Sequence, residues 1–137
     1  YPGEEEEDFK ATFDLIKNIK FINSYSFIFS PRPGTVASNF KLIDKKTSLS
    51  RLEKVQKELF DNQIRMNKDL ENKEIEVLVE NKTNGSKRLF GRSEHMTPVI
   101  FDGNDEDIGH VIKVKINNSN QSTLFGESLK IINKKVA

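Results

Sequence analysis

The chain has 137 residues, of which 35% are hydrophobic and 31% are charged, and its net charge is +1. This composition is typical of a folded globular protein and argues against a disordered chain. With no cysteine and two histidines, the sequence predicts no disulfide and no metal or iron–sulfur cluster held by these residues. No apolar run approaches the roughly 18–20 residues of a membrane span, so we expect a cytoplasmic protein without a membrane partner. The chain opens on Tyr1 and not on Met, and we expect it to be part of a longer protein.

The first 30 residues predict a helix followed by a strand. Acidic residues 4–8 precede apolar residues at helical spacing, including Phe9, Phe13 and Ile16, and a helix N-terminus favours negative charge. Residues 24–29, SYSFIF, then alternate large apolar side chains with small or aliphatic ones, which predicts a strand.

A short loop, residues 30–35, follows the predicted strand. Pro31 and Pro33 flank Arg32, and Gly34 comes next. Because proline restricts its own φ and the conformation of the residue before it, we expect the backbone around Arg32 to be rigid. The local pattern alone fits an ordinary loop with a solvated arginine as well as a functional one.

The middle of the chain is basic, since residues 41–73 carry nine basic and six acidic side chains. Its apolar spacing predicts a helix over about residues 49–68, with Ser50 and Glu53 as a capping box. Its basic face is either a solvated surface or a surface for a phosphate backbone; this face carries Lys54, Lys57 and Arg65.

From residue 74 the hydrophobic period changes to two. Five short alternating segments are predicted as strands: 74–81, 86–92, 97–101, 109–116 and 122–132. Asn84 and Gly85 between the first two are a strong hairpin signal. Five short strands in about 60 residues predict a small antiparallel barrel of OB-like size.

Two sets of motifs stand out in the chain: the run YPGEEEEDFKATFDLIKNIKFINSYSFIFSPRPGT, and later LFGRSEHMTPVIFDG, GHVIKVKI and LFGES. The first resembles the end of the radical-SAM domain of the methylthiotransferase family, and the second resembles the TRAM domain that follows it there. Arg32 between two prolines favours the branch of the family that modifies tRNA. The resemblance implies an α+β chain: residues 1–45 are the C-terminal α/β fragment of a radical-SAM partial barrel, 46–70 a linker helix, and 71–134 a five-stranded antiparallel, OB-like TRAM barrel.

The resemblance also implies an activity and its cofactors. Enzymes of this branch add a methylthio group to N6-isopentenyladenosine next to the anticodon, using S-adenosylmethionine and two 4Fe-4S clusters. This chain lacks the family's cysteine motif CxxxCxxC, so we expect it to hold no cluster and to be inactive alone. The implied rim of the S-adenosylmethionine pocket consists of Gly3, Glu4, Ser30, Arg32 and Gly34.

A TRAM-type barrel implies RNA binding, with a tRNA anticodon stem-loop as the expected partner. The remaining partners are the N-terminal and cluster-binding domains of the same protein, and we expect a monomer. Arg92 has a second interpretation, in which it pairs with a carboxylate such as Glu94 or Glu127 and holds the barrel together. The RNA-binding candidates lie around one predicted hairpin: Lys82, Lys87, Arg88, Phe90 and Arg92.

Other hypotheses stay open. The chain is a stand-alone TRAM or OB-like RNA-binding module without catalysis, or a related methylthiotransferase that acts on threonylcarbamoyladenosine or on a ribosomal protein. A purely structural barrel, in which Lys87 and Arg88 only solubilise the hairpin, also fits the pattern. His95 and His110 lack the spacing of metal ligands, and we assign no metal site.

Overall fold

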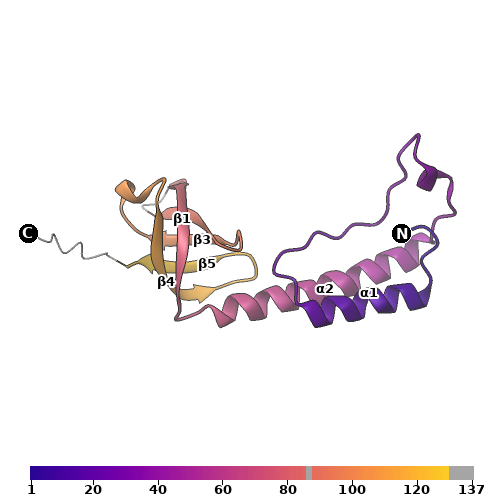
Figure 1. The fold of residues 1–137 in the computed structure, drawn as a ribbon, viewed down its shortest axis with the longest axis horizontal. Helices are drawn as coiled ribbons and strands as arrows, with labels where there is room; N and C mark the ends of the chain where they lie inside the picture. Colours follow the sequence, from indigo (N-terminus) through magenta and orange to yellow (C-terminus); the bar gives the residue numbers. More distant parts are fainter. Residues whose placement is uncertain (86–87, 130–137) are drawn as a thin grey trace, which may run out of the picture. The chain divides into compact units, whose positions relative to one another are not determined.

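Two α-helices, two short 3₁₀ helices and five strands make up the regular structure of residues 1–85 and 88–129, the part of the chain that the computed structural model describes (Figure 1). The chain divides into two units, Tyr1–Gln63 and Ile64–Ala137, and each is described by itself. The elements are α1 (Glu6–Ile19), η1 (Val36–Asn39), α2 (Lys45–Asp69), β1 (Glu74–Lys82), β2 (Leu89–Ser93), β3 (Pro98–Asp102), η2 (Asp105–Asp107), β4 (Val111–Ser119) and β5 (Leu124–Ser128).

Helix α1 confirms the amphipathic pattern at the start of the chain. Its first turn is acidic, and the backbone N–H of Glu5 donates to Oδ2 of Asp8 at 2.9 Å, which satisfies one of the free donors at the helix start. Phe9 and Ile16 are buried on one face. Within the first unit α1 lies beside α2 (Figure 1), and Arg51 and Lys54 of α2 lie over the Phe9 ring.

Helix α2 begins four residues earlier than the sequence pattern predicts. Asp44 precedes the helix, and its Oδ1 accepts the backbone N–H of Thr47 at 3.0 Å. Hydrogen bonds from the hydroxyl and the N–H of Thr47 hold the pKa of Asp44 below its ordinary value of 3.8. The capping box predicted at Ser50 and Glu53 was therefore wrong, because the carboxylate of Asp44 caps the helix six residues earlier.

The predicted strand at residues 24–29 does not form. Residues 1–63 contain no β-strand at all. The segment has no regular secondary structure, with Tyr25 90% and Phe27 82% exposed. Alternating side chains give a segment strand character, but a strand also needs a neighbour for its backbone hydrogen bonds. The α/β piece of a radical-SAM barrel is thus not seen in this unit.

The second unit is a closed barrel with strand order β1-β2-β3-β5-β4, in which β4 pairs back onto β1 (Figure 1). All five strands predicted from the sequence are present among the described residues. The prediction of a wholly antiparallel barrel was wrong at one seam, since β3 and β5 pair in parallel with Val99 beside Leu124. These two strands are not consecutive, so no hairpin fixes their relative direction.

Alternation along the strands fills the barrel with aliphatic side chains and one phenylalanine. Two bulges, at Glu80 in β1 and Asn117 in β4, bend the strands where they face Gly91 and Gly126. A Cβ at Gly126 would lie 2.1 Å from the backbone oxygen of Lys115, so only glycine permits this close approach. The core residues, each at most 1% exposed, are Val77, Val79, Leu89, Val99, Phe101, Val114, Ile116 and Leu124.

The end of α2 closes one end of the barrel. Asn67 is 2% exposed, and its Nδ2 donates to the carbonyls of Asn120 and Gln121 at 2.9 and 3.0 Å. Leu70 packs against the barrel core. The β4–β5 turn is therefore tied to the helix end by a buried amide. None of the helices in the described part of the chain has the length and apolar character needed to cross a bilayer.

Candidate nucleic-acid interface and cofactor loops

The loop around Arg32 forms a tight turn. The N–H of Thr35 donates to the carbonyl of Arg32 at 3.2 Å, and the Thr35 hydroxyl donates to the same oxygen at 2.8 Å. Pro33 and Gly34 occupy the two central positions, and Gly34 has φ +82°. Proline followed by a residue of positive φ is the pattern of a type II turn. The turn thus holds the backbone next to Arg32, while the Arg32 side chain is exposed.

Glu4, a second residue of the predicted cofactor rim, is held by Arg51 of α2. Nη1 of Arg51 lies 2.7 Å from Oε2 of Glu4 and 3.1 Å from its carbonyl oxygen. Nη2 of Arg51 lies 2.9 Å from Oε2 of Glu6. The contact joins residues far apart in the chain, and no local motif indicates it.

A cavity of about 410 Å³ lies in the first unit, within the size range of small-molecule sites. Its wall includes Glu4, Arg51, Phe9 and residues 26–29, and it is mostly apolar. Of the five residues predicted for the cofactor rim, Glu4 alone is on this wall; Gly3, Ser30, Arg32 and Gly34 are not among its lining residues. The five residues therefore do not form one pocket within this unit, and we derive no chemical step through S-adenosylmethionine from them.

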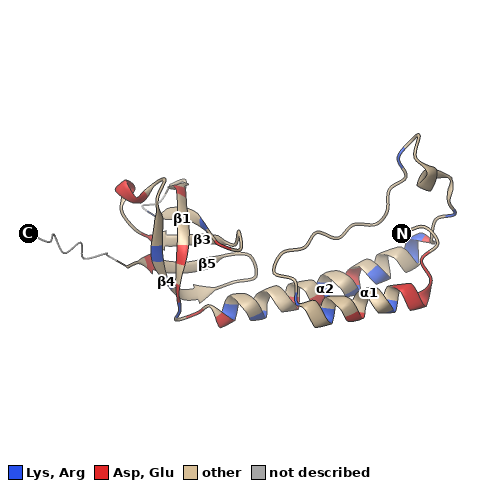
Figure 2. Cartoon of the chain, in the orientation of Figure 1, with Lys and Arg blue, Asp and Glu red and all other residues tan. Residues whose placement is uncertain are grey.

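In the barrel, each described basic residue of the predicted RNA-binding cluster is paired with a carboxylate. Lys82 Nζ contacts Oδ2 of Asp105. Nε of Arg88 lies 3.3 Å from Oδ1 of Asp102. Lys87 lies outside the described residues. The hairpin is thus a mixed-charge surface and not a purely basic one (Figure 2).

Arg92 pairs with Glu80, and not with Glu94 or Glu127 as the sequence analysis proposed. Its Nε lies 3.1 Å from Oε1 of Glu80, and its Nη1 donates to the carbonyl of Met96 at 3.3 Å. Glu80 is the residue of the β1 bulge, which turns it toward the neighbouring strand. The general expectation of a carboxylate partner holds, but the bulge that selects Glu80 has no local signal in the sequence.

Phe90 and Arg92 lie on the same face of β2 and contact each other. The guanidinium of Arg92 is 5.5 Å from the centroid of the Phe90 ring. The buried positions Leu89, Gly91 and Ser93 alternate with them, so Phe90 and Arg92 point out of the barrel. Phe90 is partly exposed, and it stays available as a surface on which a base can stack.

The predicted basic face of α2 is exposed at Lys54, Lys57 and Arg65. Nζ of Lys54 lies 5.9 Å from the centroid of the Phe9 ring on α1.

Residues 1–85 and 88–129 hold no group of three or more side chains suited to a metal ion. In the barrel, Nε2 of His95 lies 3.6 Å from Oε1 of Glu94.

Comparison with known proteins assigns the barrel to a family. Residues 68–129 match the family model of the TRAM domain. The match begins near the end of α2 and covers all five strands. The TRAM resemblance drawn from the sequence is confirmed.

The whole chain is similar to tRNA-modifying enzymes. It is 60% identical over all 137 residues to a protein of Pelagibacter ubique (strain HTCC1062) named tRNA-2-methylthio-N(6)-dimethylallyladenosine synthase, of which it covers 31%. Proteins of the same name from Natranaerobius thermophilus and Delftia acidovorans are 40% and 42% identical over 93% of the chain, which covers 29% of each. The resemblance to methylthiotransferases is therefore confirmed, and the chain spans less than a third of the length of these relatives.

Proposed function

We propose that this chain is the C-terminal portion of a radical-SAM methylthiotransferase that modifies N6-isopentenyladenosine next to the tRNA anticodon. The observation that carries the proposal is the 60% identity over the whole chain to a protein named as that synthase. The match of the barrel to the TRAM domain supports it independently. In the whole enzyme, which we place in the cytoplasm as a monomer, S-adenosylmethionine and two 4Fe-4S clusters supply the radical and sulfur-transfer chemistry.

In this proposal the chain binds tRNA and holds none of the clusters. It has no cysteine, and clusters of this kind are held by thiolates. The barrel presents Phe90 and Arg92 on its outer face for contact with the anticodon arm. Gly3, Glu4, Ser30, Arg32 and Gly34 contribute to the rim of the S-adenosylmethionine pocket, which needs walls from the rest of the enzyme.

Binding of a labelled tRNA anticodon stem-loop to the 137-residue chain tests the first part of the proposal. We expect weak binding with a negative salt dependence, because each phosphate contact steepens the log–log slope by roughly 0.7 to 0.9. The Lys87→Ala/Arg88→Ala double variant is expected to lower both affinity and slope. A folded wild-type chain that does not bind the stem-loop at low salt would contradict tRNA binding by this portion.

The enzymatic part is tested on the longer protein. The complete gene product, reconstituted with iron and sulfide, is expected to convert isopentenyladenosine-containing tRNA to the methylthio form, detected by nucleoside mass spectrometry. The 137-residue chain treated identically is expected to bind no cluster and to give no product. A coding sequence that does not continue upstream of Tyr1 into a CxxxCxxC motif would contradict this part.

A stand-alone RNA-binding module is the second candidate. It is favoured by one observation, which is that the TRAM match is confined to residues 68–129 and that these residues form a closed barrel with its own core. The same upstream coding sequence distinguishes the two candidates.

A further inference from the structure

The outer wall of the barrel carries a row of large apolar side chains across three strands. Phe90 on β2 lies opposite Ile100 on β3, and Ile100 in turn lies beside Phe125 on β5. The three are partly buried, and none belongs to the barrel core or to the side chains that pack against it. Since Leu89, Val99 and Leu124 next to them are fully buried, alternation along the strands turns the row outward. Two aromatic rings and one aliphatic side chain thus form a continuous strip, the β2–β3–β5 row.

The opposite wall of the barrel has a different character. On β1 and β4, Glu74 lies across from Lys115 and Glu76 across from Lys113. Lys115 also lies beside Glu127 of β5. Opposite charges directly across neighbouring strands stabilise a sheet that faces water. Figure 2 shows acidic and basic segments side by side on these strands. Leu78 and Val111 are exposed opposite each other on this wall, but neither β1 nor β4 contains an aromatic residue.

The β2 edge of the β2–β3–β5 row carries Arg92, which is ion-paired with Glu80 and can bind a phosphate in exchange for that carboxylate. Arg92 lies over the Phe90 ring at 5.5 Å, and Arg92 is opposite Pro98 on β3. Because Arg92 is one-third exposed, its guanidinium reaches solvent at the end of the row. A flat apolar strip that ends at a cation is complementary to a ligand with a flat ring and an adjacent negative charge. An unpaired nucleotide has these two parts, and a base stacks on an aromatic ring whatever its identity.

We infer that the β2–β3–β5 row is a stacking platform for unpaired bases of RNA, with Phe90 and Phe125 as the rings and Arg92 at the phosphate. The inference rests on the proposed function, in which this chain binds tRNA, and it deepens that proposal by naming the part of the RNA that the barrel recognises. The loop nucleotides of a stem-loop bind the row, and paired bases of the stem do not.

The test compares Phe90→Leu and Phe125→Leu in the 137-residue chain. Leucine keeps an apolar side chain on the strand and removes the aromatic face. Phe27→Leu, at an exposed phenylalanine of the first unit, is the matched control. Binding is measured by fluorescence anisotropy over a range of salt concentrations, with a stem-loop that has seven unpaired nucleotides and with a blunt duplex of the same number of phosphates.

We expect each barrel variant to bind the stem-loop about 5- to 150-fold more weakly, which corresponds to the ~1–3 kcal/mol of one base–aromatic stack. The salt slope is expected to stay unchanged, because a stack releases no counterion. Binding to the duplex is expected to be equal for all proteins. Unchanged stem-loop affinity in both barrel variants would overturn the inference, and so would an equal loss on the duplex.

A second measurement needs no variant and covers the case in which a substitution unfolds the barrel. The wild-type chain is irradiated with a stem-loop that carries 5-iodouridine in its loop, and the cross-linked peptide is identified by mass spectrometry. We expect adducts on Phe90 or Phe125. Adducts confined to α2 would overturn the inference while supporting tRNA binding, whereas a chain that binds neither RNA contradicts the proposed function itself.

Discussion

Nη1 of Arg51 lies 2.7 Å from Oε2 of Glu4, and this contact ties helix α2 to the segment just before α1. The same guanidinium binds the carboxylate of Glu6 at 2.9 Å and lies 5.2 Å from the centroid of the Phe9 ring. Burial opposes the charge on Arg51, but hydrogen bonds to Glu4 and Glu6 outweigh it and raise the pKa of the guanidinium. Arg51 therefore keeps its positive charge at neutral pH.

Arg51→Ala is expected to lower the melting temperature of the first unit by about 4–8 °C. The substitution removes a two-pronged contact and leaves the carboxylate of Glu4, which is 14% exposed, without its partner. Lys57→Ala removes one positive charge from an exposed position of the same helix and serves as the control. Differential scanning calorimetry of the three proteins measures the effect, and equal melting temperatures would show that the contact is dispensable.

Acidification is expected to weaken the start of α2 through Asp44. The pKa of Asp44 is lower in the folded chain than its ordinary value of 3.8, so folding favours the ionised form. Its stabilising effect is complete above about pH 4 and is lost as the pH falls through the folded value. Asp44→Asn keeps a helix cap without a titrating group.

NMR titration of the Thr47 amide from pH 7 to pH 2 checks this expectation. The wild-type amide signal is expected to shift with a midpoint below 3.8, and the signal of Asp44→Asn is expected to show no such transition. A wild-type midpoint above the ordinary value would contradict the bond between Asp44 and Thr47.

Neutralising the carboxylates that pair with Lys82, Arg88 and Arg92 is expected to strengthen RNA binding. Lys82, Arg88 and Arg92 each have a carboxylate partner, so a phosphate must displace that partner before it can bind. The triple variant Glu80→Gln/Asp102→Asn/Asp105→Asn is expected to increase stem-loop affinity and to steepen the salt slope by up to roughly 0.7–0.9 for each cation released. Replacing Glu74 and Glu76 on the opposite wall with glutamine is the control, and it raises the net charge by two where the triple variant raises it by three. An equal gain in both proteins would indicate a general charge effect.

The positions of the barrel strands were predictable because their side chains alternate between the apolar interior of the barrel and its outer face. Val77 and Val79 alternate with Glu76 and Leu78, and such a pattern is local to the sequence. The parallel pairing of β3 with β5 and the ion pair of Lys82 with Asp105 were not predictable, since both join segments that no hairpin connects. These contacts come from closure of the barrel, which local patterns do not encode.

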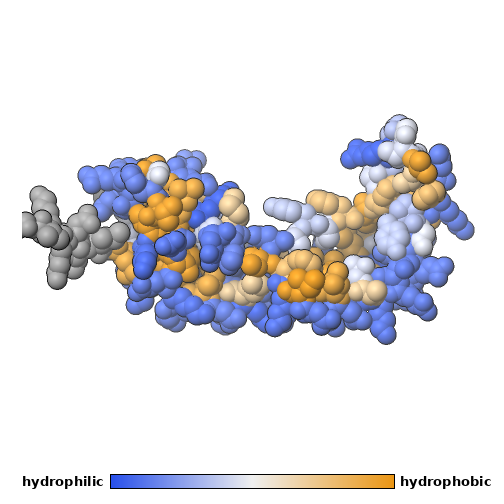
Figure 3. Space-filling view, in the orientation of Figure 1, coloured by the Kyte–Doolittle hydropathy of each residue, from blue (hydrophilic) through white to orange (hydrophobic). Residues whose placement is uncertain are grey.

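In the first unit the sequence pattern identified the helices but not what they contact. Phe9 and Ile16 indicated the buried face of α1, and the structure places Arg51 and Lys54 of α2 over the Phe9 ring. Residues 24–29 do alternate in side-chain type as a strand would, with Tyr25 and Phe27 at alternate positions. The strand is nevertheless unformed, because backbone pairing depends on a neighbour and not on the segment itself. Apolar surface stays exposed on this unit, including Leu15 and Ile19 of α1 at 52% each (Figure 3).

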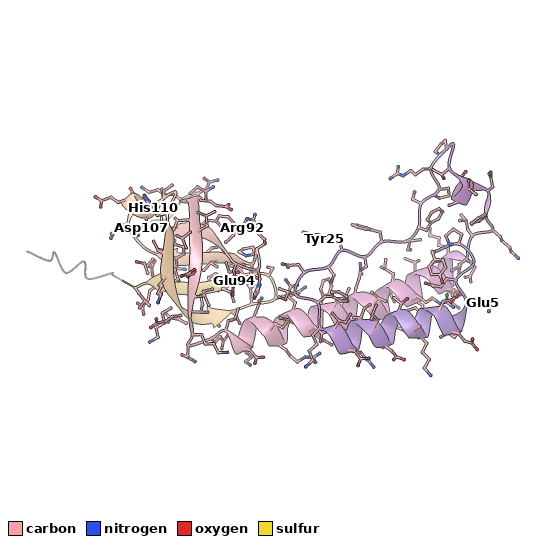
Figure 4. All side chains as sticks on the ribbon, viewed as in Figure 1. Glu5, Tyr25, Arg92, Glu94, Asp107 and His110 are labelled. Atoms are coloured by element: carbon pink, nitrogen blue, oxygen red, sulfur yellow. The ribbon has the colours of Figure 1, made fainter. Side chains whose placement is uncertain are left out.

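Limited proteolysis with chymotrypsin is expected to cut first in the extended segment between α1 and α2. Tyr25, which Figure 4 labels on this segment, and Phe27 are the most exposed aromatic residues of the chain's described part. We expect cuts after these residues before any cut in α1, where Phe9 is buried against α2. Mass spectrometry of early fragments checks the order. Early cleavage after Phe9 or Phe13 would contradict the packing of α1 on α2, and so would uniform resistance of residues 20–44.

Gly126→Ala is expected to prevent closure of the barrel at the β4–β5 seam. An added Cβ would lie 2.1 Å from the backbone oxygen of Lys115 and 3.0 Å from Cγ1 of the buried Val114. Neither a backbone oxygen inside a ladder nor a core valine can move aside without separating the strands, so we expect a loss of about 3 kcal/mol or more in the free energy of unfolding.

Gly109→Ala is the control. Gly109 has φ +86° and open space around it, and the substitution costs about 1–2 kcal/mol of backbone strain only. Urea unfolding followed by amide NMR signals of the barrel core measures both variants, and equal stability would show that the seam tolerates a side chain at position 126.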